Sequence, residues 1–251
     1  MQLGDKALLK RILLILIILI IVFGFLPFLL TAVLKHIHPI ISERVNLFNA
    51  AAHMTAKLAV LSGALGLFLG VVVGVFGLNG KNILMVFARI YVWVICGTPL
   101  LVQVLFFYYA LPAIIPALEM NELTAGICAL ALNIGAYNAS VIKSGLDAVP
   151  TAQMEAGISL GLSRFQTLRW IIFPQAIQIS LAPLMNNWIA LLKDTSLVSV
   201  IGVVELTLAA TRTNSETFLP IPTLVTIALI YLGMSSVMNV CVIILQPKTR
   251  R

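Results

Sequence analysis

Six stretches of the chain contain no Asp, Glu, Lys or Arg, and each is about 20 residues or longer. A helix needs about 20 apolar residues to cross the roughly 30 Å of hydrocarbon in a bilayer. Backbone polar groups have no water to bind inside lipid, so spanning segments are helices or the strands of a closed barrel. Barrel strands alternate apolar and polar residues, whereas these runs are continuously apolar. The sequence therefore predicts an all-α, polytopic transmembrane helix bundle with six spans, built on the runs 12–34, 58–80, 90–118, 123–142, 170–192 and 217–247.

Composition favours one membrane domain without a soluble ATPase. Of the 251 residues, 61% are hydrophobic and 10% are charged, whereas soluble globular proteins have about 25% charged residues. The apolar run 12–34 is too long for the core of a signal peptide, and no small-residue cleavage site follows it. We expect residues 1–11 to be a cytoplasmic N-terminus and residues 12–34 to be an uncleaved first span.

The net charge of +7 is spread over the segments between the apolar runs, so the sequence does not predict nucleic-acid binding. Cytoplasmic loops of membrane proteins carry an excess of Lys and Arg. Placing both termini in the cytoplasm puts most basic residues inside, with residues 246–251 as a basic tail. The residues that would lie inside are Lys6, Lys10, Arg11, Lys81, Arg89, Lys143, Arg164, Arg169, Lys248, Arg250 and Arg251.

The cysteines and histidines do not form a metal-binding pattern. The three cysteines lie far apart within apolar runs, which is typical of small packing residues. His36 and His38 have only Glu43 close by as a further ligand, and such a pair is a weak indication of metal. We therefore predict no metal site, and an interfacial outer segment over 35–52.

Several polar side chains fall inside the apolar runs. Such residues are costly in lipid and by default mark a polar pathway. The alternative role for the amides is hydrogen bonding between helices. The alternative role for Lys193 and Asp194 is a structural ion-pair network. Pro99 adds to the case, because it frees a backbone carbonyl that a neighbour or a cavity must satisfy. The candidates for lining a substrate path are Thr98, Gln103, Asn133, Tyr137, Asn187, Asp194, Thr195 and Ser196.

Glycines repeat every fourth residue in the second run, at Gly66, Gly70 and Gly74. Small residues at this spacing let helices approach closely in membranes. We expect this seam to pack spans within one subunit rather than to join two copies.

A short polar stretch separates the fourth and fifth runs. It reads Glu155-Ala156-Gly157-Ile158-Ser159-Leu160-Gly161, then nine residues, then Ile171-Ile172-Phe173-Pro174. This predicts a short helix that begins near Met154 and ends at Gly161, with Pro174 where the next helix enters the membrane. The stretch resembles the EAA loop of bacterial ATP-binding-cassette importer permeases, with Gly157 in place of a second Ala and Phe173 in place of Leu.

Other segments resemble the permeases that take up polar amino acids (histidine, arginine, lysine and glutamine type). Gly97-Thr98-Pro99-Leu100-Leu101-Val102-Gln103 is similar to one of their segments, with Cys96 where they carry arginine, and all residues of 191–199 match another. The resemblance covers about 50–245, predicted as the permease domain with a coupling loop over 147–174, and it leaves 12–34 as an addition to a five-span core. It implies a type I importer permease of the bacterial inner membrane whose coupling residues are Glu155, Ala156, Gly157, Gly161 and Pro174.

The resemblance also implies partners and a mechanism. A second permease copy or paralogue would complete the pore, two ATPase subunits would bind ATP and Mg²⁺ and dock at the coupling loop, and a binding protein would deliver the amino acid from outside. The chain would then be no enzyme and would carry no cofactor, and transport would proceed by alternating access. Two other functions stay open on the residues alone: a secondary transporter driven by an ion gradient, and a structural subunit of a membrane complex.

Overall fold

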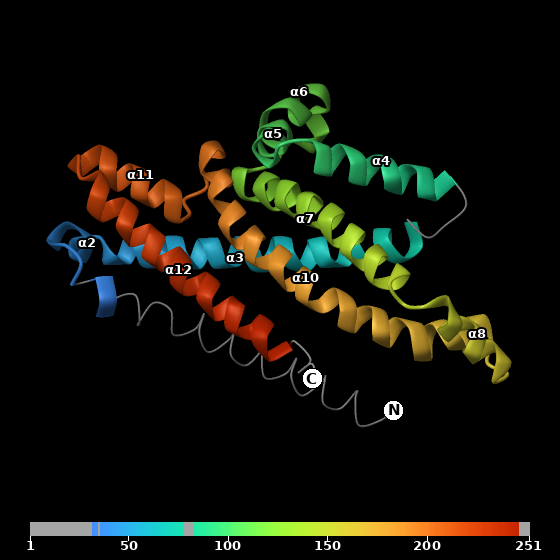
Figure 1. Cartoon of the computed structure of the whole chain (residues 1–251). Coiled ribbons are helices and arrows are strands. Elements are labelled where there is room, and N and C mark those ends of the chain that lie inside the picture. The colour runs from blue at the N-terminus through green and yellow to red at the C-terminus, as the bar shows by residue number, and fades with distance from the viewer. Residues whose placement is uncertain (1–31, 35, 78–82, 246–251) are drawn as a thin grey trace.

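The computed structural model describes residues 32–34, 36–77 and 83–245, and it contains helices and no strand over these ranges (Figure 1). The all-α prediction is therefore confirmed for the described residues. The predicted first span 12–34 lies outside them except for its last three residues. In chain order the elements are α2 (Pro39–Glu43), α3 (Val45–Val71), η1 (Val72–Gly77), α4 (Ile83–Gly97), α5 (Leu100–Leu105), η2 (Phe106–Ala110), α6 (Leu111–Ile114), η3 (Pro116–Leu118), α7 (Glu122–Asp147), α8 (Thr151–Ser159), α9 (Arg164–Thr167), η4 (Leu168–Ile172), α10 (Phe173–Asp194), η5 (Thr195–Ile201), α11 (Leu206–Thr217) and α12 (Pro220–Leu245).

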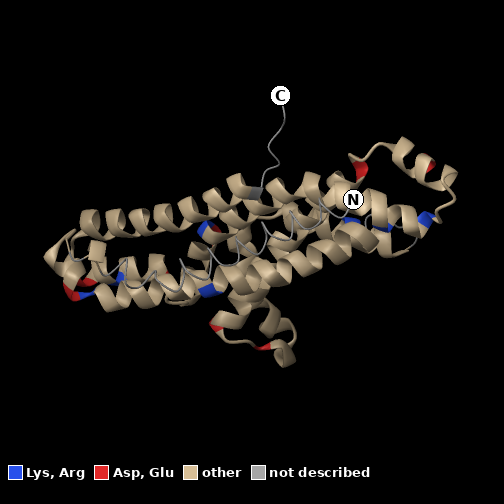
Figure 2. Ribbon diagram, turned by 90° about the horizontal axis from the view of Figure 1, so that it is seen from below, with Lys and Arg blue, Asp and Glu red and all other residues tan. Residues whose placement is uncertain are grey.

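Three helices in the described ranges are long and apolar enough to cross a membrane: Val45–Gly77, Glu122–Asp147 and Pro220–Ile244. A fourth span is possible if the bent pair Ile83–Gly97 and Leu100–Ile114 crosses as one unit. Figure 2 shows long tan stretches of ribbon between the ends of the bundle, with most Lys, Arg, Asp and Glu near the ends or on a protruding segment. This distribution fits the charge-free runs, because ionised side chains are expensive in hydrocarbon.

The third predicted span is not one kinked helix. Its two halves meet at 108°, because α4 ends at Gly97 and Pro99 adopts an extended conformation (φ −63°, ψ 135°) as the N-cap of α5. Proline also disfavours helical backbone in the residue before it. The fifth predicted span, on the run 170–192, is helical to its end: α10 stops at Asp194, and the tighter 3₁₀ turn η5 follows.

The outer segments predicted as connections contain helices. His38 caps α2 by accepting a hydrogen bond from the backbone N–H of Ile40 at its Nδ1 (3.3 Å), and α3 begins at Val45, within the segment expected to be interfacial loop. Residues Leu206–Thr217 form α11, which packs on both α3 and α12. An ion pair between Arg44 and Glu216 joins the start of α3 to the end of α11.

The glycine repeat packs α3 and its continuation η1 against α7 of the same chain, in line with the prediction that it packs spans within one subunit. A Cβ atom at Gly66 would lie 2.1 Å from Cγ2 of Ile134, and one at Gly70 would lie 2.5 Å from Cβ of Asn138. At Gly74 the obstacle is the carbonyl oxygen of Ala139 at 2.8 Å. Helices this close leave no room for side chains at the crossing, which explains why small residues recur here.

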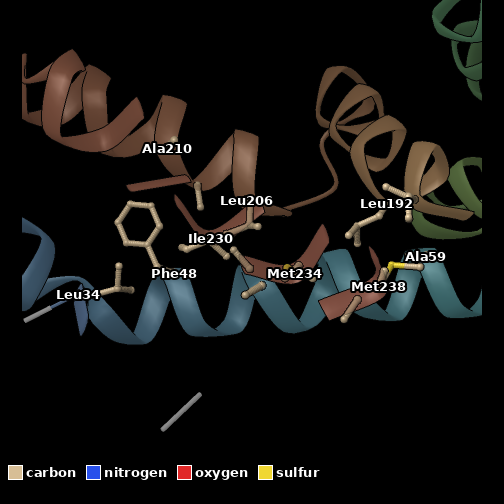
Figure 3. Packing of buried hydrophobic residues seen from close by; sticks show 14 of the residues in the cluster. Leu34, Phe48, Ala59, Leu192, Leu206, Ala210, Ile230, Met234 and Met238 are labelled. Carbon is tan, nitrogen blue, oxygen red and sulfur yellow. The ribbon is translucent and has the colours of Figure 1, made fainter. Parts of the chain in front are cut away.

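A second apolar cluster joins α3, α10, α11 and α12 at the end of the bundle opposite α8 (Figure 1). Figure 3 shows Phe48 of α3 between Leu34, at the start of the described chain, and Ala210 of α11. Leu206 of α11 and Ile230 and Met234 of α12 continue the cluster. Most of its members are below 2% exposed, so α11 is part of the packed core.

Candidate functional site

A pocket of about 550 Å³ lies where α4 breaks into α5 and faces α7 and α10. Its charged and polar side chains are those of Thr98, Asn133, Tyr137, Asn187 and Asp194, which sequence reasoning had singled out separately. The break at Pro99 forms part of the pocket's wall, because the chain bends by 108° there rather than continuing as one helix. Cys96, Gly97, Pro99, Leu100 and Ala190 complete the lining.

The side chain of Gln103 forms hydrogen bonds to backbone and side-chain groups on both sides of the α4–α5 break. Its side-chain Nε2 donates to the carbonyl oxygens of Ile95 (2.8 Å) and Thr98 (3.1 Å) and lies 2.9 Å from the Thr98 hydroxyl. Its Oε1 accepts a hydrogen bond from Nδ2 of Asn133 on α7 (3.1 Å). The carbonyls that Pro99 deprives of a helical partner are thus satisfied by one amide. Gln103 is 6% exposed, so the structure places it inside the wall and not on the pocket surface.

Hydrogen bonds between helices also fix the opposite wall. Nδ2 of Asn187 on α10 donates to Oδ1 of Asn138 on α7 (3.0 Å), and Nε1 of Trp188 donates to the carbonyl of Ala59 on α3 (3.2 Å). The interhelical role considered for the buried amides is therefore present, together with the pocket. Asn187 has both roles: it lines the pocket, and its side-chain amide donates a hydrogen bond to Asn138 on α7.

Asp194 is the one ionisable carboxylate in the pocket lining. It is half-buried at the end of α10, and it makes no hydrogen bond or ion pair within the described part of the chain. Thr195 is fully buried with its hydroxyl donating to the carbonyl of Leu192 (2.8 Å). Ser196 lines a different groove. The structure thus gathers five of the eight predicted path residues around one pocket, places Gln103 behind it, and puts Thr195 and Ser196 elsewhere.

The predicted coupling loop forms a helical hairpin at the other end of the bundle. Helix α8 begins at Thr151, three residues before the predicted start, with Pro150 as its N-cap. It ends at Ser159 with Leu160 as its C-cap. The predicted stop, Gly161, follows with φ +81°, and the N–H of Leu162 donates to the carbonyl of Gly157 (3.1 Å), a pattern that glycine favours. Ser163 and Gln166 then form a capping box that starts α9.

Gly157 faces the protein's own helix α9. The resemblance implied that Gly157 is a coupling residue; in the structure it is buried, and a Cβ there would lie 2.4 Å from Cγ2 of Thr167. Glu155 and Ala156 are exposed on the outer side of α8. Leu160 (79% exposed) and Phe165 (68% exposed) add apolar surface at the tip of the hairpin, which the sequence analysis did not single out.

Pro174 lies in an unbroken helical stretch that runs from α9 through η4 to Asp194. The π-helical turn η4 (Leu168–Ile172) directly precedes it. A π turn is a known way to absorb a proline, which lacks an N–H and clashes with the preceding turn. Helices α9 and α10 and the turn η4 therefore form one helical stretch from the hairpin to the pocket, with Pro183 inside α10.

Glu205 is a buried residue whose role the sequence analysis missed. It is 0% exposed, and it caps α11 by accepting hydrogen bonds from the N–H groups of Thr207 and Leu208 (both 2.9 Å). The hydroxyl of Tyr231 on α12 donates to the same carboxylate (2.9 Å). Glu at an N-cap position is uncommon, and Tyr231 sits within a long apolar run, so no local pattern indicated the contact.

Comparison with known proteins places this geometry in a family. Residues 66–251 match the family model described as "Binding-protein-dependent transport system inner membrane component". The chain is 40% identical over 163 residues to the glutamine transport system permease protein GlnP of Escherichia coli K12, covering 65% of this chain and 74% of that protein. It is 36% identical over 160 residues to the L-cystine transport system permease protein TcyB of Bacillus subtilis 168, covering 64% and 68%.

Solved structures of amino-acid ABC transporters have a similar fold. A chain of an amino acid ABC transporter crystallised with histidines superposes with a TM-score of 0.76 and 34% identity, covering 81% of this chain and 94% of the other. The MetNI methionine ABC transporter in an inward-facing conformation gives a TM-score of 0.68 at 18% identity, covering 81% and 97%, and this likeness concerns the fold alone.

The protein belongs to the family of inner-membrane components of binding-protein-dependent transport systems. It is a multi-pass helical protein with the type I ABC importer permease fold. The family and fold that the sequence resemblance implied are thereby confirmed.

Proposed function

We propose that this chain is the permease subunit of an ATP-driven amino-acid uptake system and that the pocket at the α4–α5 break is its substrate site. The observation that carries the proposal is the convergence of five polar side chains from three separate segments on one pocket, in a chain of a transport family. Amino-acid transport by the relatives named above supports the substrate class.

The chemistry of the lining suits a zwitterion. Asp194 would pair with the ammonium or guanidinium group of the substrate, because it is the pocket's carboxylate and forms no hydrogen bond or ion pair with the described residues. Thr98, Asn133 and Asn187 would replace the water around the remaining polar groups. Gln103 would act as a positioning residue, since it holds Thr98 and Asn133 in place.

The α8 hairpin would dock in a cleft of the ATPase subunit. Its tip exposes apolar side chains, and the capping box and the Gly157–Thr167 contact make it one rigid unit. Because α9, η4 and α10 continue from the hairpin to Asp194, movement of the ATPase would reach the pocket through one helical stretch. Alternating access would then follow from different affinities of two states for the amino acid.

Four further features belong to this proposal. The α8 end of the bundle would face the cytoplasm, with both termini on that side. A second permease copy or paralogue would complete the pore. ATP and Mg²⁺ would bind to separate ATPase subunits, so this chain would catalyse no reaction and hold no cofactor. An extracytoplasmic binding protein would deliver the amino acid at the α2 and α11 end.

Cys96 offers a direct test of the pocket, because it is partly exposed and lines it. In a Cys128→Ser, Cys241→Ser background, a small methanethiosulfonate reagent should modify Cys96, and the transported amino acid should slow that reaction at least about fivefold. An amino acid that is not transported serves as the control. Equal labelling rates with and without the transported substrate would refute the pocket as its site.

Asp194→Asn tests the charge itself. With the ATPase and binding protein reconstituted in liposomes, we expect the KM for uptake to rise about tenfold, the equivalent of about 1.4 kcal/mol, while the ATPase still co-purifies. Asn186→Ala is a matched control, because Asn186 is exposed on the same helix and does not line the pocket.

Uptake that survives ATP depletion but collapses with an uncoupler would contradict ATP-driven transport.

A further inference from the structure

Hydrogen bonds inside the wall of the pocket at the α4–α5 break determine which polar atoms remain for a ligand. The Thr98 hydroxyl donates to the carbonyl of Val94 (2.9 Å), so it has no hydrogen left to donate into the pocket. Asn133 and Asn187 each donate one N–H to a side chain of another helix, and their own side-chain oxygens make no hydrogen bond to the described residues. The two amides therefore offer a ligand two acceptor oxygens and one N–H each.

Asp194 gives the pocket a negative charge that no other lining residue balances, because the remaining residues described there are neutral. Lys193 interacts electrostatically with Asp194, but neighbouring residues on a helix project about 100° apart, and Lys193 lines the adjacent groove. Glu205 belongs to that side, because it accepts hydrogen bonds from two groove-lining residues, Thr207 and Tyr231. Two carboxylates thus accompany one ammonium group in this region, and Asp194 is the carboxylate that faces the pocket.

This charge distinguishes between classes of amino acid. The zwitterionic backbone of a free amino acid has no net charge, so a neutral amino acid such as glutamine leaves the pocket with the uncompensated charge of Asp194. An acidic amino acid adds a second negative charge. An amino acid with a cationic side chain brings one net positive charge and neutralises the pocket. Enclosing an unpaired charge costs free energy, and pairing the charge recovers part of that cost.

The shape and polarity of the lining suit a guanidinium group in particular. Guanidinium has five N–H donors and no acceptor, which matches the carboxylate of Asp194 and the free amide oxygens of Asn133 and Asn187. Tyr137, which is 44% exposed, adds an aromatic ring to the lining, and such a ring attracts a cation over its face. The volume of about 550 Å³ is adequate for an amino acid of this length.

We propose that this pocket selects amino acids with a cationic side chain, arginine above all, over neutral amino acids of the same size, and that Asp194 determines the preference. The proposal rests on the proposed function, because it takes the pocket as the substrate site. The side-chain cation pairs with Asp194, and the substrate's carboxylate accepts hydrogen bonds from the remaining N–H groups of Asn133 and Asn187. Citrulline has nearly the shape of arginine without its charge, so it is the decisive comparison.

Protection of Cys96 measures the preference in the permease itself. The complex of permease and ATPase, in the Cys128→Ser, Cys241→Ser background, is placed in lipid nanodiscs without the binding protein, whose own specificity then plays no part. Neutral methyl methanethiosulfonate labels Cys96 over a range of amino-acid concentrations. We expect arginine to protect at a concentration at least about tenfold lower than citrulline. Lysine should resemble arginine, and glutamine should resemble citrulline.

Asp194→Asn should remove the preference. We expect the protecting concentration of arginine to rise about tenfold and that of citrulline to change less than about twofold. Asn186→Ala, at an exposed position of the same helix, should preserve the preference, and thermal unfolding verifies that each variant folds. Equal weakening of arginine and citrulline by Asp194→Asn would assign the carboxylate to the ammonium group that both ligands share, and would overturn the proposal.

The wild-type measurement separates this proposal from the proposed function. Protection of Cys96 by arginine and citrulline at equal concentrations would overturn the charge preference and leave the pocket as the substrate site. Absence of protection by every amino acid would instead refute the pocket itself.

A cation added to the lining gives an independent test. Cys96 lines the same pocket as Asp194, so Cys96→Arg should weaken equilibrium binding of radiolabelled arginine at least about tenfold through repulsion of like charges. Cys96→Met, which adds a long neutral side chain at the same position, is the matched control and should change binding far less. Equal arginine binding by the two variants would contradict selection by charge.

Discussion

Single side chains decide how a proline is accommodated in this bundle. Pro99 frees backbone carbonyls inside an apolar layer, where an unsatisfied carbonyl costs free energy. The amide of Gln103 satisfies two of them and also reaches Asn133 on the neighbouring helix. One residue thus couples the α4–α5 break to α7, and the pocket's shape depends on it.

Gln103→Leu should therefore destabilise the protein although the substitution adds an apolar side chain in lipid. The carbonyls of Ile95 and Thr98 and the amide of Asn133 lose their partner, so we expect the free energy of unfolding to fall by about 2 kcal/mol. Denaturant titration in mixed micelles measures it. Gln178→Leu, at an exposed position of α10, should change stability by less than about 0.5 kcal/mol. Equal stability of the two variants would contradict this role of Gln103.

Glycine residues allow α3 and α7 to pack closely, because they have no Cβ atom at the crossing. The seam between α3 and α7 is so close that Cβ atoms at Gly66, Gly70 or Gly74 would collide with α7. Gly233 in the middle of α12 is different, because a Cβ there meets nothing within 4 Å. The two kinds of glycine predict opposite outcomes for the same substitution.

Gly70→Ala should lower the free energy of unfolding by about 1–3 kcal/mol, the usual cost of overpacking a close contact. Gly233→Ala should raise it by about 0.5–1 kcal/mol, because alanine loses less conformational entropy than glycine in a helix. Thermal unfolding of both variants in one detergent makes the comparison. The same sign of change in both variants would refute the assignment of the seam.

The coupling hairpin is a second element held by glycine. Gly157→Ala should push α8 away from Thr167 and weaken co-purification of the ATPase, because the Cβ would lie 2.4 Å from Cγ2 and 2.7 Å from Oγ1 of Thr167. Adding Thr167→Ala removes both of these atoms, so the double variant should recover part of the binding. Contacting residues of this kind give non-additive effects, and strictly additive losses in a pull-down assay would exclude the contact as the cause.

At the scale of the whole molecule, the two ends of the bundle carry different exposed apolar groups. Leu160 (79% exposed) lies just after α8, and Phe218 (84% exposed) lies in the turn between α11 and α12 at the opposite end (Figure 1). Exposed apolar side chains outside the lipid-facing region indicate contact with another protein. Under the proposed orientation, only the α8 end meets the ATPase.

Leu160→Asp should reduce the amount of ATPase recovered with the permease at least about tenfold while leaving its thermal stability unchanged, because an exposed side chain contributes little to folding. Phe218→Asp should leave ATPase recovery unchanged. Affinity purification of the assembled complex from membranes measures both. Full recovery of the ATPase with Leu160→Asp would show that the tip of the hairpin is not the docking surface.

The sequence by itself was sufficient for the helical class, the glycine seam and the stop of α8 before Gly161. These features depend on short-range patterns: charge-free length, a four-residue repeat, and a positive φ that glycine adopts readily. It also selected the polar residues that matter, since Asp194 or Asn133 in an apolar run is costly wherever it lies.

Only the tertiary structure decided which of those residues meet. Asp194 and Ser196 are two positions apart, yet they line separate cavities. The side-chain amide of Gln103 binds backbone carbonyls and does not face the pocket. The 108° bend, the helical α11 and the burial of Gly157 against Thr167 also escaped the sequence. Each of them depends on contacts between segments far apart in the chain or on the direction of a side chain, and local periodicity carries no information about either.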